Sequence, residues 1–213
     1  MTVFKYGALN SGIVLVQPVD DHDMSVLDSE VSYIRELTDK EFCLIAVRVE
    51  NWNTDLSPWM APAAFGNECF GNGASDTLAE ILKMIDNPCK TYIIGGYSLA
   101  GLFALWAVTR TDLFSGAAAA SPSVWFPGFI DYMEDHTVHT GTVYLSLGDK
   151  EERTRNPVMS KVGECIREGY TSLQRKGLDC TLEWNSGNHF KEPDLRMAKA
   201  FAWVIERTGS LAN

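Results

Sequence analysis

The fold is decided by one stretch of sequence, Thr91-Tyr-Ile-Ile-Gly-Gly-Tyr-Ser98-Leu-Ala-Gly-Leu-Phe-Ala-Leu-Trp106. Its first four residues are β-branched and aromatic, which predicts a buried strand. Residues 99–110 are helix formers and large apolar residues, enough for about three turns of helix. The small residues around Ser98 suit a sharp turn from strand to helix, where neighbouring backbone passes close by. The pattern Gly-x-Ser-x-Ala, with Ala100 in its last position, therefore predicts a nucleophile elbow that exposes the Ser98 hydroxyl.

Apolar runs and helical patterns alternate along the rest of the chain. The apolar runs are continuous, which is typical of parallel strands that are covered on both faces. Ser25 with Asp28 and Thr77 with Glu80 predict two helix starts. We expect strands at residues 13–16, 42–47, 91–94, 115–120, 143–147 and 180–184, and later helices at about 159–175 and 194–207. This order predicts an α/β fold with a mostly parallel sheet and helices on both faces.

Length, charge and cysteine content narrow the class of protein. The 213 residues suit a single domain, 1–213, with a substantial core. A net charge of −10 disfavours nucleic acid and anionic membranes as partners, and no apolar stretch is long enough to span a bilayer. The five cysteines are scattered and lack metal-ligand spacing. We therefore expect a cytoplasmic protein without disulfides, metal or cofactor.

Polar residues with catalytic chemistry follow three of the expected strands. Ser98 follows one strand, the acidic group Asp149, Glu151 and Glu152 follows another, and His189 follows the last. Ligands of an open α/β sheet bind beyond the carboxyl ends of its strands, so these residues are expected to meet there. The order nucleophile, acid, histidine is the chain order of α/β-hydrolases. The sequence therefore predicts an α/β-hydrolase fold with a catalytic triad.

A serine hydroxyl needs a base within hydrogen-bond reach, because it is a poor nucleophile at neutral pH. We assign that role to His189, which lies in a Gly-Asn-His loop after the last strand. His22 follows the first strand and could line the pocket. His136 and His139 belong to a polar loop and are expected to be solvated.

The triad acid fixes the tautomer of the histidine and stabilises its charged form. Asp149, Glu151 and Glu152 are all candidates, and we prefer Glu151. Asp149 directly follows a glycine, where it can cap the turn, and Glu152 leads into a basic segment. We expect the backbone N–H of Leu99 to donate to the oxyanion, with Val19 as a second donor chosen by its position after the first long strand.

Three motifs resemble the esterase family of α/β-hydrolases, which includes enterochelin esterases, S-formylglutathione hydrolases, feruloyl esterases and mycolyltransferases. They are residues 96–106, Ser121-Pro-Ser-Val-Trp125 and Gly148-Asp-Lys-Glu151, and the likeness extends over about residues 14–203. The stretch Trp52-Asn-Thr-Asp-Leu-Ser-Pro-Trp59 resembles a signature of a small bacterial branch.

The resemblance implies a triad of Ser98, Glu151 and His189. It also implies that Trp52, Trp59 and Trp125 line the pocket. In the branch leading to mycolyltransferases an Asp-Gly pair precedes the second oxyanion donor, whereas Gln17-Pro18 stands at that place here.

The two tryptophan-bearing segments also leave carboxyl ends of strands, so both are expected to face the crevice. Tryptophans in such loops serve equally well to pack the loop down. Asp55 is expected to hold its own loop through hydrogen bonds to nearby amides. No long insertion follows residues 117–120, so we expect no large cap domain.

These features predict a serine ester hydrolase that acts on a small-molecule ester through an acyl-enzyme intermediate. The same triad could transfer the acyl group to an alcohol, and a non-catalytic protein could retain the fold. The natural ester and the oligomeric state are not determined by the sequence.

Overall fold

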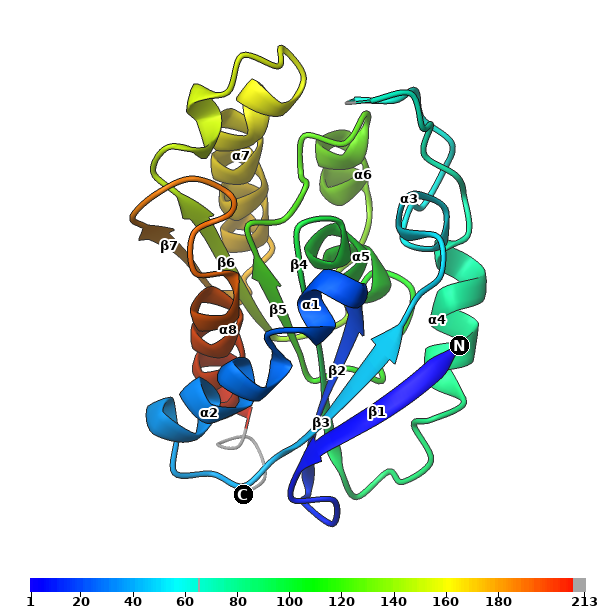
Figure 1. Cartoon of the computed structure of the whole chain (residues 1–213), viewed down its shortest axis with the longest axis vertical. Coiled ribbons are helices and arrows are strands. Elements are labelled where there is room, and N and C mark those ends of the chain that lie inside the picture. The colour runs from blue at the N-terminus through cyan, green and yellow to red at the C-terminus, as the bar shows by residue number, and fades with distance from the viewer. Residues whose placement is uncertain (65, 209–213) are drawn as a thin grey trace.

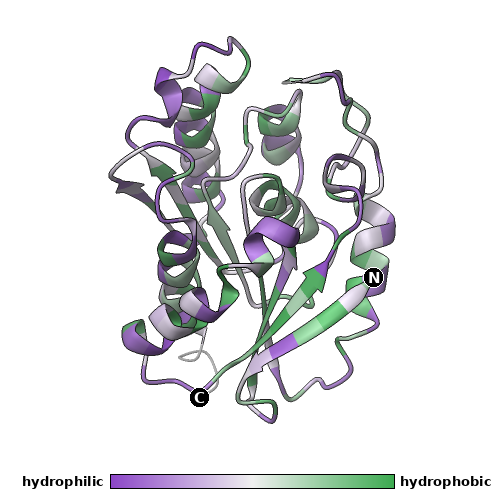
Figure 2. Cartoon of the chain, viewed as in Figure 1, coloured by the Kyte–Doolittle hydropathy of each residue, from purple (hydrophilic) through white to green (hydrophobic). Residues whose placement is uncertain are grey.

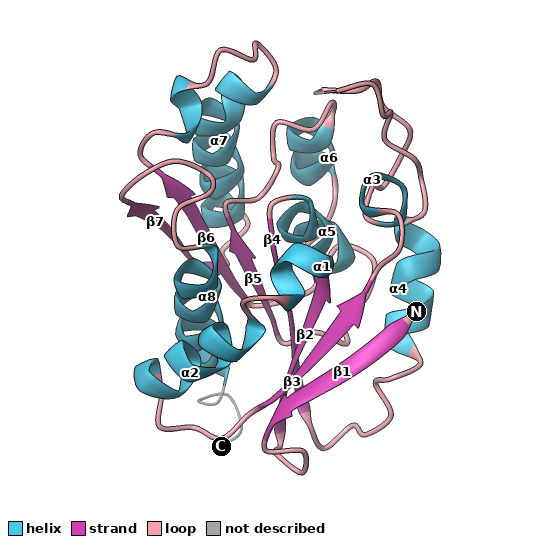
Figure 3. Ribbon diagram, in the orientation of Figure 1, coloured by secondary structure: helices cyan, strands magenta, loops and turns pink. Residues whose placement is uncertain are grey.

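The computed structural model describes residues 1–64 and 66–208. Its centre is a seven-stranded sheet of order β1-β3-β2-β4-β5-β6-β7 (Figure 1). Strand β1 (Thr2–Gly7) is antiparallel to β3, and all the other pairs are parallel. The parallel strands are β2 (Ile13–Val19), β3 (Cys43–Arg48), β4 (Thr91–Tyr97), β5 (Gly116–Ala120), β6 (Thr142–Gly148) and β7 (Asp179–Asn185). Their arrowheads point to one end of the sheet, where the loops gather (Figure 3).

Helices cover both faces of this sheet. Helices α2 (Leu27–Leu37) and α8 (Pro193–Thr208) pack on one face, with a core that includes Leu15, Ile93 and Tyr144. Four helices pack on the other face: α4 (Ala74–Leu82), α5 (Leu99–Ala107), α6 (Phe129–Asp135) and α7 (Val162–Arg175). The short helices α1 (Asp21–Met24) and α3 (Trp52–Asp55) lie at the loop-rich end, and Figure 2 colours most of α1 hydrophilic. The α/β-hydrolase architecture expected from the sequence is confirmed.

All six expected strands are present, each within a few residues of its expected bounds. Strand β1 was not expected from the sequence. It lies at the edge of the sheet with its first four residues exposed, so it has no continuous apolar run that would mark it.

Both expected helix starts are wrong. Helix α2 begins at Leu27, and Val26 makes no side-chain cap; the capping box lies earlier, where Asp20 and Asp23 cap α1. Helix α4 begins three residues before Thr77, which is buried inside it. The first N–H groups of α4 are served by the preceding loop instead, since Ala74 N donates to Ser57 O over 3.2 Å.

The segment between β5 and β6 contains only the short helix α6 and no cap domain. Across the described residues, every helix is too short or too polar to cross a membrane.

Candidate active site

Ser98 occupies the corner between β4 and α5, with φ 56° and ψ −119°. This conformation is strained for a residue with a side chain, and such strain is typical of functional corners. The turn is tight because a Cβ atom at Gly96 would collide with the backbone of Ala100. All nine residues of α5 are buried, so the helix and strand that hold the corner are anchored in the core. The expected elbow geometry is therefore present.

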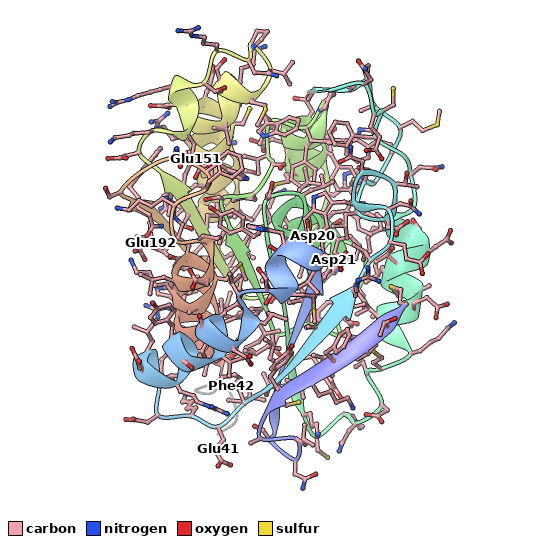
Figure 4. All side chains as sticks on the ribbon, in the orientation of Figure 1. Asp20, Asp21, Glu41, Phe42, Glu151 and Glu192 are labelled. Atoms are coloured by element: carbon pink, nitrogen blue, oxygen red, sulfur yellow. The ribbon has the colours of Figure 1, made fainter. Side chains whose placement is uncertain are left out.

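Ser98, His189 and Glu151 form one hydrogen-bonded chain. His189 Nε2 lies 3.1 Å from Ser98 Oγ, and His189 Nδ1 lies 2.7 Å from Glu151 Oε2. With the Nδ1–H donated to the carboxylate, Nε2 is left to accept the serine proton. Glu151, labelled in Figure 4, follows β6. His189 follows β7 and Ser98 follows β4, so all three lie at the carboxyl ends of parallel strands. The structure thus brings together the three residues assigned to the triad.

Glu151 is a buried carboxylate with several donors. Its Oε1 atom accepts hydrogen bonds from Gly148 N at 2.7 Å, Ser121 Oγ at 2.7 Å and Arg196 Nη1 at 2.9 Å. Burial acts to raise the pKa of Glu151, but the hydrogen bond and charge of His189, with the Ser121 and Gly148 donors, outweigh it and lower the pKa. Glu151 is therefore ionised at neutral pH, as the acid of a triad must be.

The two other candidate acids lie elsewhere. Asp149 Oδ1 accepts from Gly187 N at 2.8 Å, which ties the loop after β6 to the loop after β7. Glu152 pairs with Arg167 at 3.2 Å on the surface. Of the three carboxylates, Glu151 alone contacts His189.

Arg196, in the first turn of α8, completes the site. Its side chain is 2% exposed, and it donates to Glu151, Ser121 and Tyr97. Sequence reasoning missed this residue, although a signal exists. Ala200 and Val204 follow Arg196 by one and two turns, so the arginine falls on the apolar stripe of its helix.

Tyr97, the last residue of β4, holds the backbone of His189 by a hydrogen bond. Its hydroxyl donates to His189 O at 2.7 Å. Burial is the main reason why the pKa of Tyr97 rises to about 12, so the hydroxyl keeps its proton and remains a donor.

The remaining histidines lie outside the site. His22 is exposed on α1 and does not line the cavity at Ser98. His136 and His139 are exposed, in accordance with the expectation that they are solvated, and His136 stacks on Tyr132.

A cavity of about 680 Å³ opens beside Ser98. Its apolar wall includes Trp52, Phe70, Trp125, Met159 and Phe190, and Phe190 is 83% exposed. Asp55 holds the Trp52 loop as expected, since its Oδ2 atom accepts from Glu50 N and Asn51 N.

Trp59 does not reach this cavity, contrary to what the resemblance implied. Its Nε1 donates to Pro127 O at 2.9 Å, and its ring packs against Phe126 and Tyr132. Trp59 therefore packs its loop against the rest of the domain, which is the second role expected for a tryptophan in such a loop.

The two expected oxyanion donors differ in their placement. Leu99 lines the cavity as the first residue of α5, where an N–H has no partner within the helix. Val19 does not line it. The Val19 carbonyl accepts from Val49 N, so it points toward β3. The N–H and C=O of one strand residue point to the same side, so the Val19 N–H points away from β4 and Ser98. The choice of Val19 from its position is therefore not supported by the structure.

Asn53 was not singled out by the sequence, yet it is buried and lines the cavity with Ser98. Within residues 1–64 and 66–208 the side-chain amide of Asn53 has no hydrogen-bond partner. The main-chain carbonyl of Asn53 accepts from Ser57 Oγ and Gly71 N. This amide is available to a ligand in the cavity.

The parallel sheet with helices on both faces and the sharp corner at Ser98 are those of the α/β-hydrolase fold. No family model matches the sequence. A protein of Bacillus subtilis (strain 168), YbbA, described as uncharacterized, is 24% identical over 192 residues, which cover 80% of this chain and 76% of the relative.

Solved structures with the same fold include several esterases. An IroE-like serine hydrolase from Shewanella oneidensis matches with a TM-score of 0.73 at 16% identity, over 92% of this chain and 71% of the other. The siderophore hydrolase EstA from Aspergillus nidulans matches with a TM-score of 0.69 at 18% identity, over 99% and 90%. A ferulic acid esterase matches with a TM-score of 0.61 at 12% identity, over 96% and 97%. The esterase resemblance expected from the sequence is thus confirmed at the level of the fold.

Proposed function

We propose that this protein is a serine ester hydrolase that works through an acyl-enzyme intermediate. Ser98 Oγ attacks the ester carbonyl while His189 Nε2 takes the hydroxyl proton. His189 then gives that proton to the departing alcohol, which leaves the acyl group on Ser98. Water, deprotonated by His189, attacks the acyl-enzyme, and the acid product leaves as Ser98 recovers its proton. Glu151 orients His189 throughout and stabilises its charged form.

The observation that carries this proposal is the hydrogen-bonded chain from Ser98 through His189 to Glu151, with distances of 3.1 and 2.7 Å. These are the contacts that a hydroxyl nucleophile and its base require. The relatives of known structure support the same reaction class, since they are named as siderophore hydrolases, a serine hydrolase and a ferulic acid esterase.

The oxyanion that forms during attack needs preorganised donors. We assign one to the Leu99 N–H at the start of α5. The unpaired amide of Asn53, in the same cavity, is a second group that can bind the carbonyl oxygen or the leaving group.

The substrate is proposed to be a small-molecule ester with a bulky or planar group. Trp52, Trp125 and Phe70 offer a broad apolar wall of the kind that such groups contact. The net charge of −10 and the five free cysteines favour a cytoplasmic protein that does not bind nucleic acid.

The test uses two serines of the same cavity. Ser123 Oγ lies 3.3 Å from Ser98 Oγ, so Ser123→Ala is a matched control. We expect Ser98→Ala to lower kcat/KM for p-nitrophenyl acetate by about 10⁴-fold or more and to abolish labelling by a fluorophosphonate probe. Ser123→Ala is expected to keep labelling and most of the turnover.

A probe that labels Ser123, or wild-type turnover in Ser98→Ala, would refute the assignment. A folded wild type that is neither labelled nor active would favour a non-catalytic binding protein. Product analysis with and without an alcohol acceptor separates a hydrolase from an acyltransferase.

A further inference from the structure

The buried guanidinium of Arg196 touches four separate segments of the site. Arg196 Nη1 lies 2.9 Å from Glu151 Oε1, 3.1 Å from Ser121 Oγ and 3.2 Å from Tyr97 Oη. Its Nη2 lies 3.3 Å from Ser186 O and 2.9 Å from Asn188 O. These partners belong to the loops after β6 and β7, the turn after β5 and the end of β4. One side chain therefore ties together the segments that bear the acid, the histidine and the nucleophile.

The contacts to the histidine loop hold two consecutive carbonyls, those of Asn188 and His189. Arg196 binds the carbonyl of Asn188, and Tyr97, itself a partner of Arg196, binds the carbonyl of His189. Within the part of the chain that the structure describes, Glu151 is the only carboxylate with which Arg196 forms an ion pair. The same carboxylate holds His189 Nδ1 through its other oxygen.

Stability alone gives little reason to bury this charge. Both side chains of the Arg196–Glu151 pair are less than 5% exposed, so both have lost their water. Replacing a buried ion pair with packed apolar residues is often neutral or stabilising. A planar guanidinium, with several N–H donors in fixed directions, does offer one thing that an apolar residue lacks, which is a fixed geometry for the oxygens around it.

We propose that Arg196 is a positioning residue of the catalytic triad, which holds the Glu151 carboxylate and the His189 loop in the geometry that lets His189 reach Ser98. Arg196 does not contact the cavity that holds the substrate. It acts through Glu151 and through the backbone of residues 186–189. Without it, Glu151 loses a donor on Oε1, and the histidine loop loses its two carbonyl contacts. This inference rests on the proposed esterase function.

The experiment is a double-mutant cycle on activity, built from Arg196→Met, Glu151→Gln and the combined variant. We expect Arg196→Met to lower kcat by about 10²-fold with KM changed by less than about 2-fold, because geometry and not substrate binding is lost. In the Glu151→Gln background the same substitution is expected to cost clearly less, about 10-fold or below, because the acid is already absent and only the contacts to residues 186–189 remain to be lost.

The matched control is Lys199→Met, which removes another ion-paired cation from α8. Lys199 pairs with Glu183 at 2.7 Å and does not contact the triad, so activity is expected to be unchanged. A merely structural Arg196 would lower kcat equally in both backgrounds, and that outcome would overturn the proposal.

If Arg196→Met fails to fold, Arg196→Lys takes its place in the cycle. Lysine keeps the charge but cannot reach Glu151 and the two carbonyls together, so we expect about a 10-fold loss in kcat that is again smaller in the Glu151→Gln background. A kcat for Arg196→Lys equal to that of the wild type would overturn the proposal.

A second readout needs no turnover. We expect the His189 Nδ1–H bonded to Glu151 to give a low-field proton NMR signal, which can be assigned by its absence from His189→Gln. We expect this signal to shift or broaden in whichever of Arg196→Met and Arg196→Lys folds, and to stay in place in Lys199→Met. An unchanged signal would refute the positioning role even if the protein proves not to be an esterase. A wild-type protein without esterase activity would instead count against the proposed function.

Discussion

Glu151 and Glu30 are two buried carboxyl groups against the same sheet, with very different surroundings. Glu151 is 8% exposed as a whole residue and is held by His189, Ser121, Gly148 N and Arg196. Glu30, on α2, is 2% exposed and has one donor, the Gln17 side chain, at 3.3 Å. Its Oε1 atom and Gln17 Oε1 are buried without a partner among the described residues.

The two groups consequently titrate in opposite directions. The donors around Glu151 overcome burial and lower its pKa. Around Glu30 burial dominates, with Asp23 and Asp194 adding to it against the Gln17 hydrogen bond, and the pKa of Glu30 rises well above its ordinary value. Burial alone therefore does not decide whether a carboxyl group is charged. Its donors and cations decide it, and in this protein they are gathered at the site that uses the charge.

The largest effect is expected from Glu151→Gln, which removes the charge that distinguishes Glu151 from Glu30. A neutral amide no longer stabilises the charged histidine and can hold the wrong tautomer, so we expect kcat/KM to fall by about 10³–10⁴-fold. Glu152→Gln, one residue along the chain, is the matched control and is expected to stay near the wild type, because Glu152 contacts Arg167 on the surface. A loss as severe in Glu152→Gln as in Glu151→Gln would contradict the assignment, provided that circular dichroism shows both variants to be folded.

The second prediction concerns stability and comes from Glu30. A carboxyl group whose pKa is raised in the folded state binds more protons folded than unfolded. Its stability contribution is therefore full below its unfolded-chain pKa and is lost as pH rises, by up to about 1.4 kcal/mol per pH unit.

Glu30→Gln removes the ionisable group, so the free energy of unfolding no longer falls through Glu30 as pH rises. The new amide remains a polar partner for Gln17. We expect the free energy of unfolding at pH 8 to rise by about 2 kcal/mol, with no gain at pH 4 and no change in kcat. Urea unfolding from pH 4 to pH 8 measures it. A variant less stable than the wild type at pH 8 would mean that Glu30 makes a contact worth more than its burial costs.

The elbow was predictable because all of its determinants lie in residues 91–106. The strand, the small residues and the helix each have a local signal, and the turn that they form needs no distant partner. The preference for Glu151 over Asp149 agrees with the contact of Glu151 to His189, but the local reason for it does not hold. Asp149 does not cap the turn that follows Gly148; it accepts from Gly187 N, 38 residues away in the loop after β7.

The remaining parts of the site depend on contacts between distant segments. Arg196 lies 45 residues from Glu151, and its burial depends on how α8 packs on β4, β5 and β6. The direction of the Val19 amide follows from strand register, and the place of Trp59 follows from the aromatic residues around α6. A single sequence specifies residue types and local spacing at these positions, but not which side chains meet across the sheet.

The smallest expected effect comes from Asp23, the neighbour of Glu30 in the capping box of α1. Burial, followed by the charge of Asp20, raises the pKa of Asp23 to about 6. Its contribution to stability is therefore also lost as pH rises, and the loss ends near pH 6. Asp23→Asn keeps an acceptor for Asp20 N, so we expect the free energy of unfolding to rise by about 1 kcal/mol at pH 7, a gain that disappears below pH 4.

Asp21→Asn is the matched control for Asp23→Asn. The exposed Asp21 carboxylate pairs with Arg48, and the hydrogen bond and charge of that arginine lower the pKa of Asp21. Above pH 5 this control is expected to show none of the gain. Equal urea midpoints for Asp23→Asn and the wild type at pH 7, with equal m-values, would mean that Asp23 is hydrated and that Glu30 alone causes the decline in stability with pH.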